Sequence, residues 1–177
     1  MSDRAPSNPP GVWDLAALQA AIAAEPGRWR PLAFTNGCFD LLHVGHLRYL
    51  QTAKTFGRTL VVGLNSDASV AAIKPPKPSQ PARPIVPQAQ RAELLASLKP
   101  VDAVTIFAEP TATNLIAALK PDVYVKGGDY TVETLPESPT VQAYGGRIEL
   151  VQFEVSTSTS GIVARILATG LPSISDP

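Results

Sequence analysis

Short apolar runs alternate with helical patterns along most of the chain. The runs, bounded by glycine, proline or polar residues, predict buried strands at 32–34, 60–64, 103–107, 123–125 and 147–153. Apolar residues at spacings of three and four predict helices at 13–24, 90–98, 113–119 and 161–167, and another that follows residues 43–46 and ends at Gly57. This alternation is typical of an α/β domain with a parallel sheet and right-handed crossovers.

The stretch 34–50, FTNGCFDLLHVGHLRYL, contains both histidines of the chain, His43 and His46, on either side of Gly45. Two histidines three residues apart at a strand-to-helix junction can direct both imidazoles at one bound group. The glycine permits a close approach to the backbone, and the start of a helix presents free N–H donors. The pattern therefore predicts a phosphate site.

Two other interpretations of these residues are weaker. A lone histidine is usually a structural residue, but here both share one motif. A zinc site would need further ligands, and Cys38, the single cysteine, has no metal-ligand spacing around it. We therefore expect no metal held by the protein alone, and Cys38 to be a small buried residue.

The composition narrows the class of protein. The 177 residues suit one domain, expected at 12–170 between tails at 1–11 and 171–177. Fifteen basic and fifteen acidic residues argue against a nucleic-acid partner, because such proteins usually carry a basic surface. No apolar run is long enough for a membrane span, and Asp14 and Gln19 interrupt the only candidate secretory signal. One cysteine fits a reducing, cytoplasmic location. The sequence leaves a homodimer open.

Polar residues follow several predicted strands, where open α/β sheets bind ligands. Asn65 and Asp67 follow the second strand, although Asp67 could simply cap the next helix. The sequence KGGDY, residues 126–130, follows the fourth strand and could be an ordinary turn. Hydroxyls at residues 158–160 precede the last helix, where they could cap it or donate to a phosphate.

The segment 74–87, KPPKPSQPARPIVP, has six prolines and predicts an extended loop. It also carries Lys74, Lys77 and Arg83. We expect these cations to be exposed, and also mobile without ligand if the loop is a flap. Two interpretations stay open: a flap that closes over bound phosphates, or a static linker.

HVGH matches the HxGH signature of the nucleotidylyltransferase superfamily. Class I aminoacyl-tRNA synthetases share a looser form of it, but they need a longer chain. The full stretch 34–50, together with KGGDY, resembles the adenylyltransferase domain of ADP-heptose synthases over roughly residues 30–168. The resemblance implies a single Rossmann-like domain with a five-stranded parallel sheet of order 3-2-1-4-5 and helices on both faces.

The resemblance also implies transfer of AMP from ATP, with Mg²⁺, to a sugar 1-phosphate, that of D-glycero-β-D-manno-heptose. A related transferase that uses CTP and glycerol phosphate, or ATP and FMN, is the nearest alternative, and a non-catalytic nucleotide-binding module is a second. The catalytic candidates are His43, His46 and Lys54. Phosphate and nucleotide binding are assigned to Thr35, Asn36, Gly37, Phe39, Gly45, Arg91, Lys126, Ser158, Thr159 and Ser160. Substrate binding is assigned to Asp40, Asn65, Asp67, Gly127, Gly128 and Asp129, with support of the turn as the alternative for Asp40.

Overall fold

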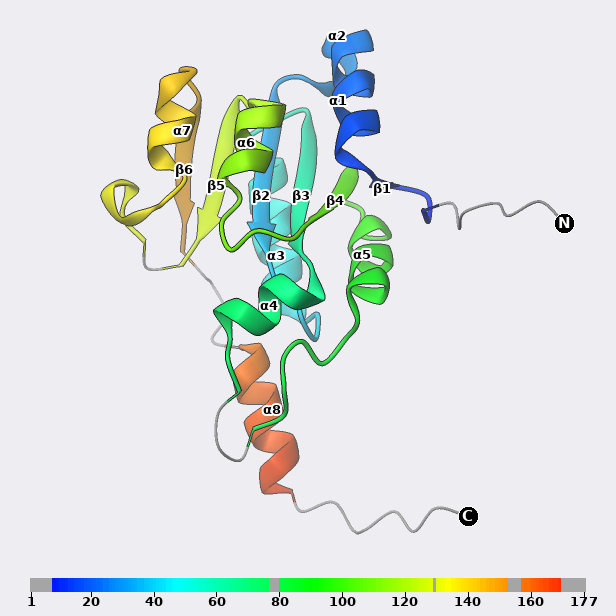
Figure 1. The fold of residues 1–177 in the computed structure, drawn as a ribbon, viewed down its shortest axis with the longest axis vertical. Helices are drawn as coiled ribbons and strands as arrows, with labels where there is room; N and C mark the ends of the chain where they lie inside the picture. The colour runs from blue at the N-terminus through cyan, green and yellow to red at the C-terminus, as the bar shows by residue number, and fades with distance from the viewer. Residues whose placement is uncertain (1–7, 77–79, 129, 153–156, 170–177) are drawn as a thin grey trace, which may run out of the picture.

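The computed structural model describes residues 8–76, 80–128, 130–152 and 157–169. Six strands form one parallel sheet in the order β1-β4-β3-β2-β5-β6 (Figure 1). Their bounds are Val12–Trp13 for β1, Leu32–Gly37 for β2, Thr59–Asn65 for β3, Ala103–Phe107 for β4, Val123–Gly127 for β5 and Arg147–Val151 for β6.

The prediction of a five-stranded sheet is wrong, although the five predicted strands keep their order 3-2-1-4-5 relative to one another. The sheet has a sixth strand, β1, which pairs with β4 at one edge, while the other five lie in the order β4-β3-β2-β5-β6. Two residues are too few to give a periodic pattern, so β1 merged with the helix expected from Trp13. That helix begins only at Leu15, because the Asp14 carboxylate accepts a hydrogen bond from the Ala17 N–H at 2.8 Å and caps it.

Helices cover both faces of the sheet, which confirms the α/β class. On one face lie α1 (Leu15–Ala24), α2 (Pro26–Trp29), α6 (Thr113–Leu119) and α7 (Ser138–Ala143). On the other lie α3 (Val44–Lys54) and α5 (Gln88–Ala96). Because side chains alternate along a strand, Phe34 packs into the first core and its neighbour Ala33 into the second.

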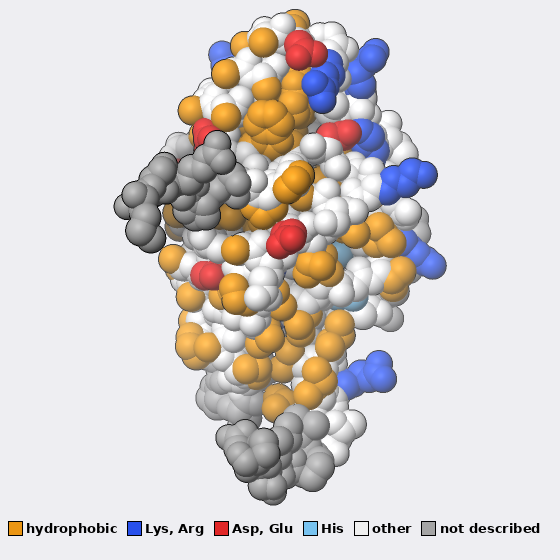
Figure 2. Space-filling view, turned by 90° about the vertical axis from the view of Figure 1, so that its right-hand side faces the viewer, with side chains coloured by type: hydrophobic (Ala, Val, Ile, Leu, Met, Phe, Trp, Pro, Cys, Tyr) orange, Lys and Arg blue, Asp and Glu red, His pale blue; other side chains and the backbone are white. Residues whose placement is uncertain are grey.

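Three short elements lie outside these layers: α4 (Asp67–Ile73), a 3₁₀ turn η1 (Val132–Thr134) and α8 (Thr159–Ala168). Figure 1 shows α8 extending away from the sheet, beyond the carboxyl ends of the strands, and Val163 is its one buried residue. Figure 2 shows hydrophobic side chains gathered towards that end of the molecule, and α8 leaves Ile166 and Leu167 exposed. Within the described ranges, no helix is both long and apolar enough to cross a bilayer.

Strands β2 and β5 separate at their carboxyl ends. The chain passes from β2 to β3 and β4 on one side, then returns to β5 on the other side of β2. The β2–β3 pairing continues to Gly37 and Leu64, but the β2–β5 pairing ends at Phe34 and Tyr124. Such a reversal in strand order is where open α/β sheets bind ligands, so the fold points to the space between β2 and β5.

Candidate functional site

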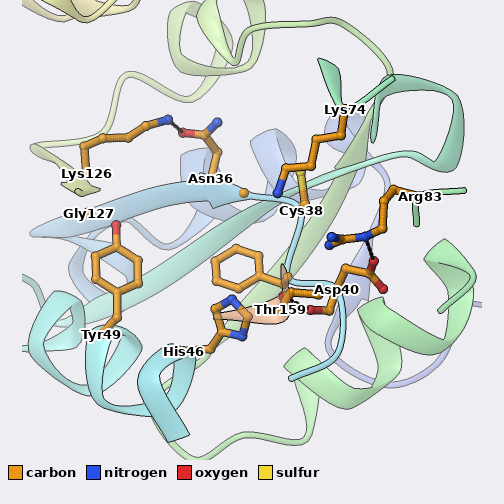
Figure 3. A pocket seen from close by; sticks show the side chains of 12 residues that line it. Asn36, Cys38, Asp40, His46, Tyr49, Lys74, Arg83, Lys126, Gly127 and Thr159 are labelled. Carbon is orange, nitrogen blue, oxygen red and sulfur yellow. Dashed lines mark hydrogen bonds and ion pairs between the residues drawn. The ribbon is translucent and has the colours of Figure 1, made fainter. Parts of the chain in front are cut away.

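A cavity of about 140 Å³ lies at this separation (Figure 3). It is bounded by the loop after β2, the first turn of α3, the end of β5 and the start of α8. Its lining combines four potential cations with backbone and aromatic groups: Asn36, Gly37, Cys38, Phe39, Asp40, His46, Tyr49, Lys74, Arg83, Lys126, Gly127 and Thr159. The structure therefore brings together segments that are far apart in the sequence.

The two histidines stack at the start of α3. Their ring centroids lie 3.9 Å apart with the planes inclined by 23°. His43 is the N-cap, and its Nδ1 accepts a hydrogen bond from the Gly45 N–H at 3.2 Å. A Cβ at residue 45 would lie 3.0 Å from the His43 ring, so any larger residue would press on the ring and require it to shift by a few tenths of an ångström. His46 also contacts Phe39 edge-on, at 5.5 Å between centroids.

His46 is an uncharged donor or acceptor in the free protein. Burial, together with the neighbouring His43 and Lys74, lowers the pKa of its imidazole to about 4. Its Nδ1 is buried and has no hydrogen-bond partner among the described residues. A buried nitrogen without a partner has an energetic cost, which a ligand that bonds to it would remove.

We expect His46 to titrate with a midpoint of about 4 in the free protein. Because the folded pKa lies below the unfolded value, His46 contributes stability above about pH 6.5 that is lost as the pH falls towards 4. The Cε1–H chemical shift, followed by NMR from pH 3 to 8, measures this midpoint directly. His43, whose pKa is also lowered by burial, serves as the internal comparison. A His46 midpoint at or above 6.5 would contradict the packing described here.

Asp40 organises the loop between β2 and α3. Phe39 and Leu41 on either side have φ of 45° and 49°, a left-handed conformation that is strained for such side chains. The Asp40 carboxylate is buried and accepts hydrogen bonds from Arg83 Nε at 2.5 Å, from the Ile85 N–H at 2.9 Å and from the Val86 N–H at 3.0 Å. Although burial alone would raise it, these donors lower the pKa of the carboxyl. Asp40 thus supports the turn after β2, which was the alternative to substrate binding.

Two cations of the proline-rich segment lie at the pocket. The expectation that Arg83 is exposed is wrong: its side chain is 13% exposed and pairs with Asp40, because the buried carboxylate requires a counter-charge. Its Nη2 is buried without a partner among the described residues. Lys74 is exposed and lines the cavity. Lys77 lies outside the described residues.

The structure does not bring Lys54 to the pocket. Eight residues of helix separate it from His46, a rise of about 12 Å, and α3 runs away from the carboxyl edge of the sheet. Lys54 Nζ instead bonds to Asp102 Oδ2 and to the Arg58 carbonyl oxygen, each at 2.5 Å, near the amino ends of β3 and β4. Of these two lysines, Lys74 and not Lys54 lines the cavity.

Arg91 is a structural residue in the free protein. It is 1% exposed and donates to the carbonyl oxygens of Val86, Cys38 and Asn65 and to the Asp67 carboxylate. These bonds tie the loop after β2 to the end of β3. Asn65 is buried and donates to Ser69 Oγ, so neither Asn65 nor Asp67 lines the pocket. Ser66, not Asp67, caps α4.

The remaining candidates divide between the wall and its support. Thr159 and Gly127 line the cavity, and Thr159 Oγ1 donates to the Asp40 carbonyl oxygen at 2.6 Å. Ser158 caps α8 by accepting from the Gly161 N–H, and Ser160 is exposed beside it. Thr35 is fully buried and bonds to the Tyr49 hydroxyl at 2.6 Å. Gly128 adopts a φ of 117°, which favours glycine, and Asp129 lies outside the described residues.

Comparison with known proteins identifies the family. Residues 34–170, which make up most of the chain, match the family model described as cytidylyltransferase-like. The chain belongs to the cytidylyltransferase-like family. This confirms the resemblance drawn from HVGH, and it places the histidine pair, the β5 turn and α8 inside the part of the chain that the family shares.

Curated relatives within this family are much longer proteins. "Bifunctional protein HldE" of Geotalea uraniireducens is 51% identical over 161 residues, covering 91% of this chain and 32% of the relative. The protein of the same name from Caulobacter sp. is 47% identical over 163 residues, covering 90% and 32%. The chain thus spans about a third of the length of the curated relatives it matches.

Solved structures support the fold. The lipopolysaccharide core biosynthesis protein from Thermoplasma volcanium superposes with a TM-score of 0.54 at 27% identity, covering 70% of this chain and 96% of that one. The macrolide-efflux protein from Streptococcus pneumoniae superposes with a TM-score of 0.52 at 22% identity, covering 73% and 49%. The second likeness concerns the fold alone.

Proposed function

We propose that the chain is an adenylyltransferase that transfers AMP from ATP to a sugar 1-phosphate, with D-glycero-β-D-manno-heptose 1-phosphate as the acceptor. Support comes from the identity of about half to proteins named HldE over most of this chain, and from the resemblance of 34–50 and KGGDY to ADP-heptose synthases. A solved relative named for lipopolysaccharide core biosynthesis agrees with an activated sugar as product. We place the reaction in the cytoplasm, where ATP is available.

The histidine pair at the pocket is the observation that carries this proposal. Lys74, Arg83 and Lys126 also line the pocket, and Asp40, the one carboxylate among the described lining residues, is occupied by three donors. No carboxylate is therefore free at the described lining to act as a general base. Phosphoryl-group transfer to a phosphate needs none, because the attacking phosphate oxygen is already an anion at neutral pH.

In the proposed reaction, an oxygen of the sugar phosphate forms a bond to the α-phosphorus of ATP, and the bond from that phosphorus to the β-phosphate oxygen breaks. Pyrophosphate leaves with the bonding electrons. The protein contributes position and donors for the charge on the pentacoordinate phosphorus. His46 faces that charge from one side, with His43 stacked on it, and the cations of the lining hold the phosphates.

The described lining offers Mg²⁺ no free carboxylate, so the ion would reach the pocket on the nucleotide, held by its phosphates and by water. The described residues contain no group of three or more His, Cys, Asp or Glu side chains placed to hold a metal ion. Mg²⁺ usually keeps several waters and binds substrate phosphates together with one or two carboxylates. When bound, the ion would neutralise charge on the departing pyrophosphate; Lys74 and Arg83 add positive charge at the same pocket.

A pyrophosphate-release assay tests the function. With ATP, Mg²⁺ and D-glycero-β-D-manno-heptose 1-phosphate, we expect steady release of pyrophosphate and formation of an ADP-sugar that mass spectrometry identifies. Glycerol 3-phosphate and FMN serve as competing acceptors. Binding of ATP without turnover for any acceptor would favour the non-catalytic module, and turnover with another acceptor would replace the sugar.

We expect ATP to be strongly preferred over CTP, although the family takes its description from cytidylyltransferases. The resemblance at 34–50 and KGGDY is to adenylyltransferases, and a purine offers more apolar surface to a site beside the sheet. Parallel pyrophosphate assays at equal concentrations of the two nucleotides measure the ratio of kcat/KM. Equal or greater activity with CTP would move the chain to the glycerol phosphate branch.

A further inference from the structure

Asn36 and Lys126 bridge the two strands beyond the point where their backbone pairing ends. Phe34 of β2 and Tyr124 of β5 are the last register partners. Asn36 and Lys126 each lie two residues further on, so they stand on the same face of the sheet as Phe34 and Tyr124. Side chains therefore continue the connection between β2 and β5 where the cavity begins (Figure 3).

A single oxygen makes this connection. Asn36 Oδ1 accepts a hydrogen bond from the Tyr124 hydroxyl at 2.8 Å and another from Lys126 Nζ at 3.1 Å. An amide oxygen has two lone pairs, and both are used here. Since an ammonium group is only a donor, the oxygen and not the NH₂ of Asn36 must face it. Asn36, assigned from the sequence to phosphate binding, thus faces protein groups with its oxygen.

Tyr124 is a rigid and permanent donor. Its side chain is fully buried and packs against Phe34, with the ring centroids 6.1 Å apart. Burial, and next the carboxylate of Glu137, raise the pKa of the Tyr124 hydroxyl, so it keeps its proton at every physiological pH. In the sequence, Tyr124 stands two residues before Lys126 on one strand. This spacing places both side chains on the same face of the sheet and could have pointed to Tyr124.

The Lys126 ammonium is held by one described hydrogen bond and has N–H groups left for a ligand. Asn36 Oδ1 is the only acceptor that its Nζ reaches among the described residues, which leaves two of its three N–H groups for a ligand. The ring centroids of Tyr124 and Tyr130 lie 5.8 Å and 5.6 Å from Nζ, on the scale of cation–π contacts. Burial lowers the pKa of this ammonium, whereas the negative charge of Glu137 acts in the opposite direction.

We propose that Tyr124 is a positioning residue that acts through Asn36 to fix the Lys126 ammonium in the cavity, where it binds a phosphate oxygen of a substrate. Asn36 is the link, and Lys126 alone touches the ligand. The inference rests on the proposed function only for the identity of the ligand. ATP and the sugar 1-phosphate both offer this oxygen, and the arms of the experiment distinguish them.

Tyr124→Phe removes the hydroxyl and keeps the ring in the core. Isothermal calorimetry with ATP and, separately, with D-glycero-β-D-manno-heptose 1-phosphate should show Kd raised about 5- to 10-fold for one of them, the scale of one neutral hydrogen bond. Tyr144→Phe is the matched control, because the buried Tyr144 hydroxyl has no partner within the described ranges and its ring packs against the same core. Its Kd values should equal those of the unaltered protein.

A double-mutant cycle separates positioning from a merely structural effect. Lys126→Met should raise Kd for the same ligand about 10- to 100-fold, as expected for loss of a charged donor. Adding Tyr124→Phe to Lys126→Met should then change Kd no further, because Tyr124 acts only through the ammonium. Equal effects of Tyr124→Phe with and without Lys126 would overturn the proposal, as would unchanged Kd values for both ligands.

The result is independent of turnover. If ATP binds to the unaltered protein but no acceptor reacts, the proposed function fails while the cycle on the Kd for ATP still tests Tyr124. If the acceptor reacts but the cycle is additive, the positioning role fails and the function stands. Absence of binding of both ligands to the unaltered protein would overturn both.

Discussion

Replacing His46 with alanine should lower kcat about 10²- to 10³-fold, the usual loss for one donor directed at developing charge. His46 lies at the pocket, stacked on His43, and its Nδ1 has no partner in the part of the chain that the structure describes, so it can bond to a phosphate oxygen without breaking a described interaction. KM for ATP should change far less than kcat if the bond strengthens in the transition state. Initial rates of pyrophosphate release at saturating substrates measure the effect.

Val44→Ala is the matched control for His46→Ala. Val44 belongs to the same helical turn but is 48% exposed, so its truncation should leave both kcat and the melting temperature close to those of the unaltered protein. His46→Ala should also fold, because the residue is only partly buried. Near-normal turnover of His46→Ala at saturating ATP would remove His46 from the catalytic group.

Asp40→Asn should reduce the free energy of unfolding by about 3–5 kcal/mol, the cost of breaking a buried ion pair by removing one charge. The carboxylate is 1% exposed and accepts from Arg83 and from two backbone N–H groups. An amide has one acceptor oxygen and leaves the guanidinium of Arg83 buried without a counter-charge. Urea unfolding at pH 7, followed by circular dichroism, gives the difference.

The loss of unfolding free energy in Asp40→Asn should become smaller as the pH falls. Because the pKa of Asp40 is lower in the folded protein than in the unfolded chain, its stabilisation is complete above about pH 4 and disappears as the pH falls through the folded value. The difference between Asp40→Asn and the unaltered protein should shrink accordingly. Glu149→Gln, which removes an exposed ion pair with Arg147, should cost less than about 1 kcal/mol at any pH. A similar small cost for Asp40→Asn would contradict its role as an anchor.

The sequence predicted the fold where a pattern extended over several residues. The strands β2 to β6 and the helices α3, α5 and α6 are long enough to show period two, continuous burial or a helical face, and each was located. The edge strand β1 has two residues and α2 has four, so neither produces a period. Their structure depends on partners in β4 and α1 that a local pattern cannot reveal.

The sequence predicted the location of the site better than its individual contacts. His46 of HVGH, Thr159 and Lys126 do line one cavity. Each lies at the end of a helix or strand, and the sequence motifs located those ends. Lys54 was misplaced, because the two helical turns that separate it from His46 lead away from the pocket along α3. Arg91 and Asn36 face protein groups in the free structure, and a sequence does not show whether a polar side chain is already satisfied. The role of Tyr124, and the choice of Lys74 over Lys54 at the cavity, became visible only when distant segments were placed side by side.

The separation of β2 from β5 also bears on how the domain reaches its working form. Asn36 and Lys126 are 90 positions apart along the chain, and Thr159 bonds to Asp40 across 119. Contacts that close such long loops form late, since their entropic cost precedes their gain. During synthesis the β2–β3 pair can form early, whereas the cavity cannot exist until Thr159 has left the ribosome. A nascent or truncated chain can therefore acquire much of its sheet and still be unable to bind a nucleotide.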